Sequence, residues 1–327
     1  MLPNSRIYVA GHRGLAGSAI TRKLLALGYD NLLLRSHAEL DLADQSTVRN
    51  LFEAEKPEYV FLAAAKVGGI LANDTYPADF IYSNLTIQSN VIHESWRSGV
   101  KRLLFLGSSC IYPRACPQPM REEHLLTGPL EHTNRPYAVA KIAGVEQCWS
   151  YNRQYGTRLL AAMPTNMYGP GDSYDLDNSH VLPALIRKVH EAKSEDAAEI
   201  AVWGTGMPMR EFLHSDDMAD AVVFLMNLDE PEYAQLVRAD NCPVINVGFG
   251  EEVAIGDLAL MVAEIVGYRG RIRFDPGKPD GTPRKLLDSS RLSALGWRPR
   301  VSLRAGIADA YEDFLARLGA ATASPSG

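Results

Sequence analysis

Runs of apolar residues alternate with segments of helical spacing through the first half of the chain. The apolar runs have the length of buried strands and cover residues 6–11, 31–36, 59–65, 101–109 and 158–166. Helical spacing is found between and after them, at residues 15–28, 44–55, 77–98 and 137–155. Strands that are apolar on both faces are typical of a parallel sheet covered by helices on each side. The pattern therefore predicts an α/β fold with a doubly wound parallel sheet.

The pattern changes after Asn166, where a loop rich in glycine, aspartate and asparagine precedes a helical segment at about 180–193. A helix at 218–227 and a strand at 243–248 indicate a return to the first sheet. We therefore expect a first domain at 1–170 and a smaller interleaved α/β domain. The division assigns about 212–248 to the first sheet, 171–211 and 249–320 to the smaller domain, and 321–327 to a frayed tail.

Three glycines stand between the first strand and the first helix. Gly11, Gly14 and Gly17 have the spacing G-x-x-G-x-x-G, which lets backbone N–H groups and a helix N-terminus approach a pyrophosphate. Three glycines alone also fit an ordinary tight turn. The strand before them and the helix after them favour a Rossmann-type dinucleotide site.

The end of the second strand distinguishes between NAD and NADP. An NAD site places an acid there for the ribose 2′-hydroxyl, whereas this chain has Arg35, Ser36 and His37, with no acid before Glu39. Together with Arg13 in the glycine turn, these residues fit a 2′-phosphate better than a hydroxyl. The alternative is that Arg35 is only a solvated charge at a strand end.

The bulk properties of the chain exclude several classes of protein. A net charge of −6 and a pI near 5.8 argue against a nucleic-acid partner. No apolar run is long enough to span a membrane, and the opening residues lack the layout of a signal peptide. The cysteines at 110, 116, 148 and 242 lack zinc-type spacing and form no disulfide framework. No metal is therefore expected, and a reducing cytoplasm is the expected location.

The stretch "YAVAK" places Tyr137 and Lys141 on one helix face. A lysine beside a phenol favours the ionised form, which makes tyrosine a usable proton donor and acceptor. Ser108 ends the preceding strand and could hydrogen-bond the same substrate oxygen. The pair alone is common on surface helices, so the hypothesis depends on its combination with the glycine turn and the serine.

These motifs resemble the extended type of the short-chain dehydrogenase/reductase superfamily. The blocks "AAAKVGGI", "FLGSSCIYP", "MPTNMYGP", "NSHVLPAL", "MREFLH" and "KPDGTPRKLLD" narrow the resemblance to the GDP-L-fucose synthase family, GDP-4-keto-6-deoxy-D-mannose 3,5-epimerase-4-reductases. The resemblance implies an enzyme that uses NADPH to convert this GDP-sugar to GDP-L-fucose. It also implies a homodimer packed through helices near 77–98 and 137–155.

The resemblance gives a role to the thiol in "SSCIY". Related dehydratases carry a carboxylate where this chain has Cys110, at a position that faces the sugar ring. The protons at C3 and C5 are acidified by the C4 ketone, and a thiolate can remove them. The family supplies His180 as the group that returns a proton to the opposite face. Without the family, Cys110 reads as a buried apolar group and His180 as a solvated loop residue.

The resemblance also assigns residues to the two ligands. The NADP(H) site would comprise Gly11, His12, Arg13, Gly14, Leu15, Ala16, Gly17, Arg35, His37, Asp41, Leu42, Leu106, Gly107, Ser108, Ser109, Lys141, Pro164, Thr165, Asn166, Met167 and His180. The GDP-sugar would meet Lys188, Trp203, Arg210, Asp280 and Lys285. Two positions depart from the family, because His37 and Lys188 stand where relatives often carry arginine. Lysine keeps the charge without the bidentate fork, and His37 is mostly neutral at pH 7.

Two other functions stay open at this stage. A nucleotide-sugar 4-epimerase or dehydratase could recycle tightly bound NAD, although the missing acid near Arg35 and the thiol at Cys110 argue against it. A non-catalytic NADP sensor could share the fold, although it would have no need of Ser108, Tyr137 and Lys141.

Overall fold

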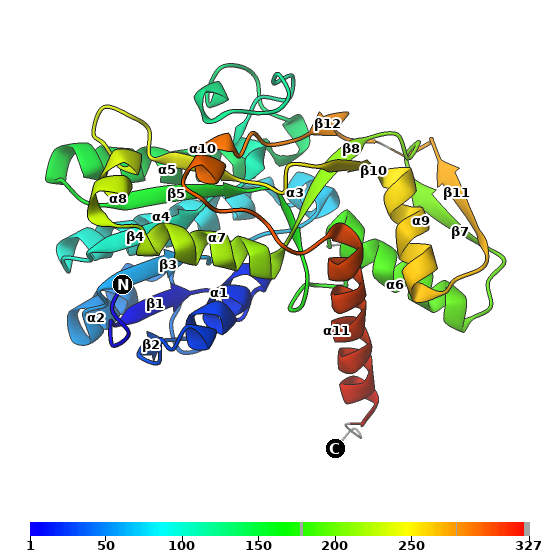
Figure 1. The fold of residues 1–327 in the computed structure, drawn as a ribbon, viewed down its shortest axis with the longest axis horizontal. Coiled ribbons are helices and arrows are strands. Elements are labelled where there is room, and N and C mark those ends of the chain that lie inside the picture. Colours follow the sequence, from blue (N-terminus) through cyan, green and yellow to red (C-terminus); the bar gives the residue numbers. More distant parts are fainter. Residues whose placement is uncertain (177–178, 279, 324–327) are drawn as a thin grey trace.

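The computed structural model describes residues 1–176, 179–278 and 280–323, and its main feature is a parallel sheet of six strands (Figure 1). The strand order is β2-β1-β3-β4-β5-β9, and every pairing is parallel. The strands are β1 (Ile7–Ala10), β2 (Leu32–Leu33), β3 (Tyr59–Leu62), β4 (Arg102–Leu106), β5 (Leu159–Pro164) and β9 (Val244–Val247). The predicted doubly wound parallel sheet is confirmed.

Helices cover both faces of this sheet. One face packs against α1 (Leu15–Ala26) and α7 (Ser215–Asn227), and the other against α2 (Gln45–Glu55), α4 (Pro77–Arg97) and α5 (Arg135–Tyr155). In β1, Ile7 and Val9 lie in one core and Tyr8 and Ala10 lie in the other. The strand is apolar throughout because both of its faces are buried. A short helix α8 (Glu230–Leu236) precedes β9, and α3 (Ile70–Thr75) follows β3.

A second region has its own sheets and its own core. It contains β6 (Asn166–Tyr168), β8 (Met209–His214), β10 (Glu252–Ala254) and β12 (Arg284–Lys285) in one sheet and the pair β7 (Glu199–Trp203) and β11 (Arg271–Asp275). Its helices are α6 (Val181–Ser194), α9 (Ile255–Val266) and α11 (Leu303–Ala323), whereas α10 (Ser290–Ala294) packs through Leu292 into a core of the large sheet. A third apolar cluster from α6, α9 and α11 fills this region, which Figure 1 places at one end of the large sheet.

Some boundaries differ from the sequence prediction. Only two residues of the run 31–36 pair in the sheet, and the run 158–166 is divided between β5 and β6, which belong to different sheets. Helix α11 continues to Ala323, three residues into the segment expected to fray, and residues 324–327 lie outside the described residues. The limits of the two domains stay a prediction. Among the described residues, no helix is both long enough and apolar enough to cross a membrane.

Candidate active site

The glycine turn lies between β1 and α1, and its three positions differ in whether the fold requires glycine there. Gly11 has φ +84°, and a Cβ there would lie 2.8 Å from the backbone of Ala64, two residues after β3. A Cβ on Gly17 would lie 2.1 Å from the Gly11 carbonyl oxygen, so this glycine lets α1 approach the strand. A Cβ on Gly14 would meet only that oxygen at 3.6 Å. The fold itself therefore does not require glycine at 14, and the space above it is open.

The N-terminus of α1 fits a pyrophosphate. No side chain caps it, so the first backbone N–H groups of the helix have no side-chain acceptor. Arg13 beside it is exposed, and Nδ1 of His12 is buried without a hydrogen-bond partner. Leu15 and Ala16 form the first turn of the helix itself. This end of the sheet therefore offers donors and a cation for a dinucleotide.

The residues predicted for the 2′-phosphate are not all directed to a ligand. Arg35 donates from Nη2 to Oε1 of Glu55 at 2.9 Å and from Nη1 to the Leu34 carbonyl at 3.0 Å. His37 is 86% exposed, and its Nδ1 lies 3.9 Å from the Asp41 carboxylate. The distant partner of Arg35 on α2 could not be read from the local sequence.

Glu39, the first acid after β2, is engaged by its own turn. Its Oε2 accepts from the backbone N–H of Ser36 at 2.8 Å and from the Ser36 hydroxyl at 2.6 Å. These hydrogen bonds lower the pKa of Glu39, and Arg35 and Arg13 act in the same direction. An NAD site needs an acid that is available to the ribose 2′-hydroxyl, whereas the Glu39 carboxylate already accepts hydrogen bonds from Ser36. The sequence shows only that Glu39 is the first acid after the strand, and not that Ser36 binds its carboxylate.

The ends of β4 and β5 form the floor of the site. A Cβ on Gly107 would lie 2.0 Å from Cε of Met163, so the end of the Met163 side chain packs directly on Gly107. Thr165 and Asn166 donate through their side chains to the Glu211 carbonyl on β8, at 3.3 and 2.8 Å. Of the other predicted cofactor residues, Ser109 begins a short 3-10 helix, Pro164 ends β5 and Met167 lies in β6. The Asp41 carboxylate accepts from the Ala43 N–H, and the Leu42 carbonyl accepts from the Asn90 side chain.

The structure brings Ser108, Cys110, Tyr137 and Lys141 together where β4 meets the first turns of α5. The Ser108 hydroxyl accepts from the Cys110 N–H at 3.4 Å. Burial raises the pKa of Tyr137, Cys110 raises it further, and the Ser108 hydroxyl opposes the rise. The ring of Tyr137 packs edge-on against Phe80 of α4, with centroids 6.3 Å apart.

Lys141 was expected beside the Tyr137 phenol, but its hydrogen bond goes to a backbone carbonyl. Its ammonium is buried and donates to the Leu106 carbonyl at 2.8 Å, while it lies 5.7 Å from the centroid of the Tyr137 ring. Burial lowers the pKa of Lys141 to about 8. The expected lowering of the tyrosine pKa is therefore absent from this arrangement, because burial of the phenol outweighs a cation that is bound to the strand end.

Cys110 and His180 come from different parts of the fold and share one cation. Burial raises the pKa of the Cys110 thiol, and Lys285 and Lys141 oppose that rise. The pKa of His180, at the N-terminus of α6, is lowered by the surrounding protein and then by Lys285. The His180 side chain is solvent-exposed. Lys285 was predicted as a substrate contact, and its position near both groups was not predicted, because it depends on how β12 is placed in the fold.

Of the residues predicted for the GDP-sugar, Trp203, Arg210 and Lys285 lie on β7, β8 and β12, Lys188 lies on α6, and Asp280 precedes β12. Register pairs Lys285 with Arg210, so two cations stand side by side, and burial lowers the pKa of Arg210. Lys188 instead donates to the Ala201 carbonyl at 2.8 Å. The Asp280 carboxylate accepts from the N–H and hydroxyl of Thr205, and Trp203 is 56% exposed.

Comparison with known proteins identifies the family. Residues 7–238 match the NAD dependent epimerase/dehydratase family. The chain is 56% identical to GDP-L-fucose synthase 1 of Arabidopsis thaliana, with 95% of this chain and 94% of that protein covered. It is 53% identical to the GDP-L-fucose synthase of Escherichia coli K12, with 96% and 98% covered. The chain belongs to the GDP-L-fucose synthase family.

Solved structures agree with this family assignment. A GDP-D-glycero-L-gluco-heptose synthase from Campylobacter jejuni, solved in the presence of NADPH, is 39% identical with a TM-score of 0.89, and 96% of this chain and 99% of that chain are covered. A GDP-L-fucose synthetase from Naegleria fowleri bound to NADP has a TM-score of 0.86 over 98% and 96% of the chains, and its 24% identity shows a common fold.

Proposed function

We propose that the chain is an NADPH-dependent GDP-L-fucose synthase. It converts GDP-4-keto-6-deoxy-D-mannose to GDP-L-fucose by epimerisation at C3 and C5 and reduction at C4. The observation that carries the proposal is the gathering of Ser108, Cys110, Tyr137 and Lys141 at one strand end, in a chain more than half identical to synthases of this name over nearly its whole length.

The cofactor is NADP(H), and when bound it supplies the hydride for C4. The open N-terminus of α1 and Gly14 support the pyrophosphate, while exposed Arg13 and the guanidinium of Arg35 lie near the end of β2. The engagement of Glu39 by Ser36 removes the acid that would favour a free 2′-hydroxyl.

Epimerisation needs a base and an acid on opposite faces of the sugar ring. The Cys110 thiolate removes the proton from C3 or C5, and the electron pair moves toward the C4 oxygen as an enolate. His180 gives a proton to the other face of the same carbon, so the configuration is inverted without net oxidation. Because burial raises the pKa of Cys110, the nearby Lys285 is important for forming the thiolate.

Reduction completes the sequence with a proton from Tyr137. As C4 is reduced, the phenol of Tyr137 protonates the C4 oxygen and Ser108 hydrogen-bonds the same oxygen. Lys141 stabilises the resulting phenolate, and to do so its ammonium must shift from the Leu106 carbonyl toward the phenol oxygen. The ketone thus activates the epimerised carbons first and is consumed last.

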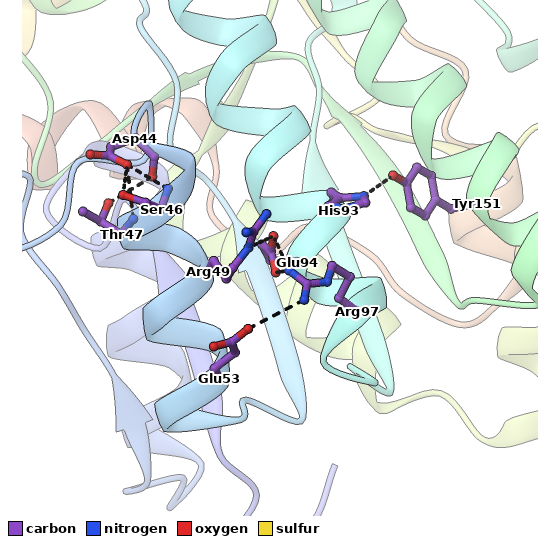
Figure 2. A network of polar contacts seen from close by, with 9 residues as sticks. All are labelled: Asp44, Ser46, Thr47, Arg49, Glu53, His93, Glu94, Arg97 and Tyr151. Carbon is purple, nitrogen blue, oxygen red and sulfur yellow. Dashed lines mark hydrogen bonds and ion pairs between the residues drawn. The ribbon is translucent and has the colours of Figure 1, made fainter.

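The assembly is a homodimer that packs α4 and α5 against the same helices of a second copy. These helices carry an aromatic group in which Trp96 and Tyr155 stack at 4.2 Å, and Tyr155 is 45% exposed. In Figure 2, Nδ1 of His93 on α4 points to the hydroxyl of Tyr151 on α5, 2.8 Å away, so the two helices are joined before any partner binds. Sedimentation equilibrium should give twice the chain mass.

The deciding experiment incubates the protein with NADPH and GDP-4-keto-6-deoxy-D-mannose and identifies the sugar by NMR. GDP-L-fucose with stoichiometric loss of NADPH is the expected result. A dehydratase or 4-epimerase that recycles bound NAD would consume no NADPH, and a sensor would bind NADPH without any new sugar.

A further inference from the structure

A lysine lies over an exposed indole at the far end of the substrate region. Register places Asp275 of β11 opposite Trp203 of β7, and the chain turns directly after Asp275. The turn is fixed because Lys278 N–H donates to the Asp275 carbonyl at 3.1 Å and Gly277 N–H to the Asp275 carboxylate at 3.1 Å. It brings Nζ of Lys278 to 5.2 Å from the centroid of the Trp203 ring.

The loop after Trp203 is fixed by hydrogen bonds to Asp280. Gly204 has φ +82°, and a Cβ there would lie 2.2 Å from Oδ1 of Asp280. The two oxygens of Asp280 accept from Thr205, at 2.7 Å from its N–H and 2.9 Å from its hydroxyl. Asp280 therefore fixes the loop that presents Trp203, so that an exposed aromatic ring is available in a defined place for stacking.

The Lys278 ammonium is free to bind a ligand. Within residues 1–176, 179–278 and 280–323, no carboxylate or carbonyl accepts a hydrogen bond from it, whereas Lys188 and Lys141 each donate to a backbone carbonyl. A cation–π contact at an exposed site is weak, so a base that stacks on the ring can displace the ammonium to the ring edge. There it remains a donor with no acceptor function.

This donor suits one purine edge better than the other. Guanine presents two adjacent acceptors, O6 and N7, whereas adenine pairs its N7 acceptor with an N6 amino donor. We propose that Lys278 is a base-specificity residue, which donates to the O6 and N7 edge of a guanine stacked on Trp203. The inference rests on the proposed function, and it adds the residue that separates GDP-sugars from ADP-sugars.

The test measures nucleotide binding to the full-length chain by calorimetry. The probes are GDP, IDP and ADP, because IDP keeps O6 and N7 but lacks the 2-amino group. Lys278→Met should raise the Kd for GDP and for IDP by about 5- to 50-fold, the range for losing a good base-edge contact, and change the Kd for ADP less than about 2-fold. Lys278→Arg should retain most of the preference.

The control is another cation–π pair, the exposed Arg153 over half-buried Trp149 at 5.3 Å. Arg153→Met removes the same kind of contact and should leave all three Kd values unchanged. Equal weakening of GDP and ADP by Lys278→Met would overturn the inference, because the lysine would then act only on the diphosphate. Unchanged binding of GDP, or no binding of GDP to the unmodified chain, would overturn it as well.

Failure of the inference and failure of the proposed function look different. If the unmodified chain makes GDP-L-fucose but Lys278→Met keeps the ratio of GDP to ADP affinity, only the inference is wrong. If the unmodified chain binds GDP and Lys278→Met alters that ratio while no sugar product forms, the base site stands and the proposed function is wrong.

Discussion

The two chemical steps are supported by different kinds of structure. Ser108, Tyr137 and Lys141 lie on the end of β4 and the start of α5, two elements that pack in the same core through Phe105 and Val145. The pair proposed for epimerisation comes from both regions, because Cys110 follows β4 whereas His180 is the N-cap residue of α6 in the second region.

The difference indicates where each step is vulnerable. The reductive group keeps its geometry as long as one sheet and one helix stay together. The epimerising group requires two regions with separate cores to keep their relative position, and Lys285 must follow on β12. We therefore expect mutations between the regions to impair epimerisation more than reduction.

The largest expected effect separates reduction from epimerisation. Tyr137→Phe removes the proton donor for the C4 oxygen, so NADPH consumption should fall by roughly 10²- to 10⁴-fold. Exchange of the C3 and C5 protons with deuterated water should continue, since Cys110 and His180 are intact. Proton NMR beside absorbance of the nicotinamide measures both. If exchange stops together with reduction, the two groups are not separable.

The converse change is Cys110→Ser. A serine hydroxyl is a much weaker acid than a thiol, so it should not form the base, and exchange at C3 and C5 should fall at least about 100-fold. Some unepimerised ketone should still be reduced, because Ser108, Tyr137 and Lys141 remain. Exchange at the unmodified rate would mean that the thiol only fills space. His180→Gln is the companion variant and should leave partial exchange without correct inversion.

The sequence predicted what depends on short, continuous motifs. The sheet was predictable because its strands are apolar on both faces, and Tyr137 and Lys141 because one helix turn separates them. The contacts of these residues were not predictable, because they join distant segments. The bond from Lys141 to Leu106 spans 35 positions, and the bond from Thr205 to Asp280 spans 75.

Other residues had partners that no local pattern indicates. Arg35 was predicted to meet a phosphate, and it pairs with Glu55, which lies on the following helix. Glu211 is buried on β8 and accepts from the backbone N–H groups of Gly250 and Leu287 at 2.8 and 3.0 Å. An acid within the apolar stretch of a strand is the only sequence signal that could have marked it.

The third prediction breaks the link between the two halves of the epimerising site. Asn246 on β9 accepts from the Tyr112 hydroxyl at 2.6 Å and donates to the carbonyls of Met120 and Asp288 at 3.0 and 3.1 Å. It thereby joins the segment after Cys110 to the segment after Lys285. Asn246→Ala leaves the buried Tyr112 hydroxyl without its acceptor and removes one donor from the carbonyls of Met120 and Asp288, although Met120 still accepts from the Asp288 N–H. The free energy of unfolding should fall by about 1–3 kcal/mol.

The product mixture reports whether Asn246 matters for alignment as well as stability. Below the unfolding midpoint, the share of reduced but unepimerised sugar should rise in Asn246→Ala. The matched control is Asn31→Ala, since exposed Asn31 donates to the Asn4 carbonyl at 3.1 Å far from the site. A loss of stability in Asn246→Ala with an unchanged product mixture would contradict the role in alignment.

The smallest effect concerns Gly171 and Asp172, where the second region meets α1 away from the proposed catalytic residues. Gly171 approaches Ser18 of α1, since a Cβ there would lie 2.9 Å from the Ser18 hydroxyl, and the neighbouring Asp172 is buried. Burial raises the pKa of Asp172 to about 7, nearby Asp313 acts in the same direction, and the Ser173 N–H and Arg317 oppose it. The folded chain therefore holds a proton on Asp172 at pH values where the unfolded chain has lost it.

This difference makes stability fall as pH rises. The contribution of Asp172 is neutral below about pH 3, where both states are protonated, and its cost grows until about pH 7 and then stays constant. Asp172→Asn should match the unmodified chain near pH 3 and be about 1–2 kcal/mol more stable at pH 8, a fraction of the full shift because the site can relax. Urea unfolding across this range measures it, with exposed Asp30→Asn as control. Parallel stability curves for the Asp172 variant and the unmodified chain would show that the carboxyl is ionised in the folded state. The rates of exchange and reduction should be unchanged in this variant, because the strain that it relieves lies outside both catalytic groups.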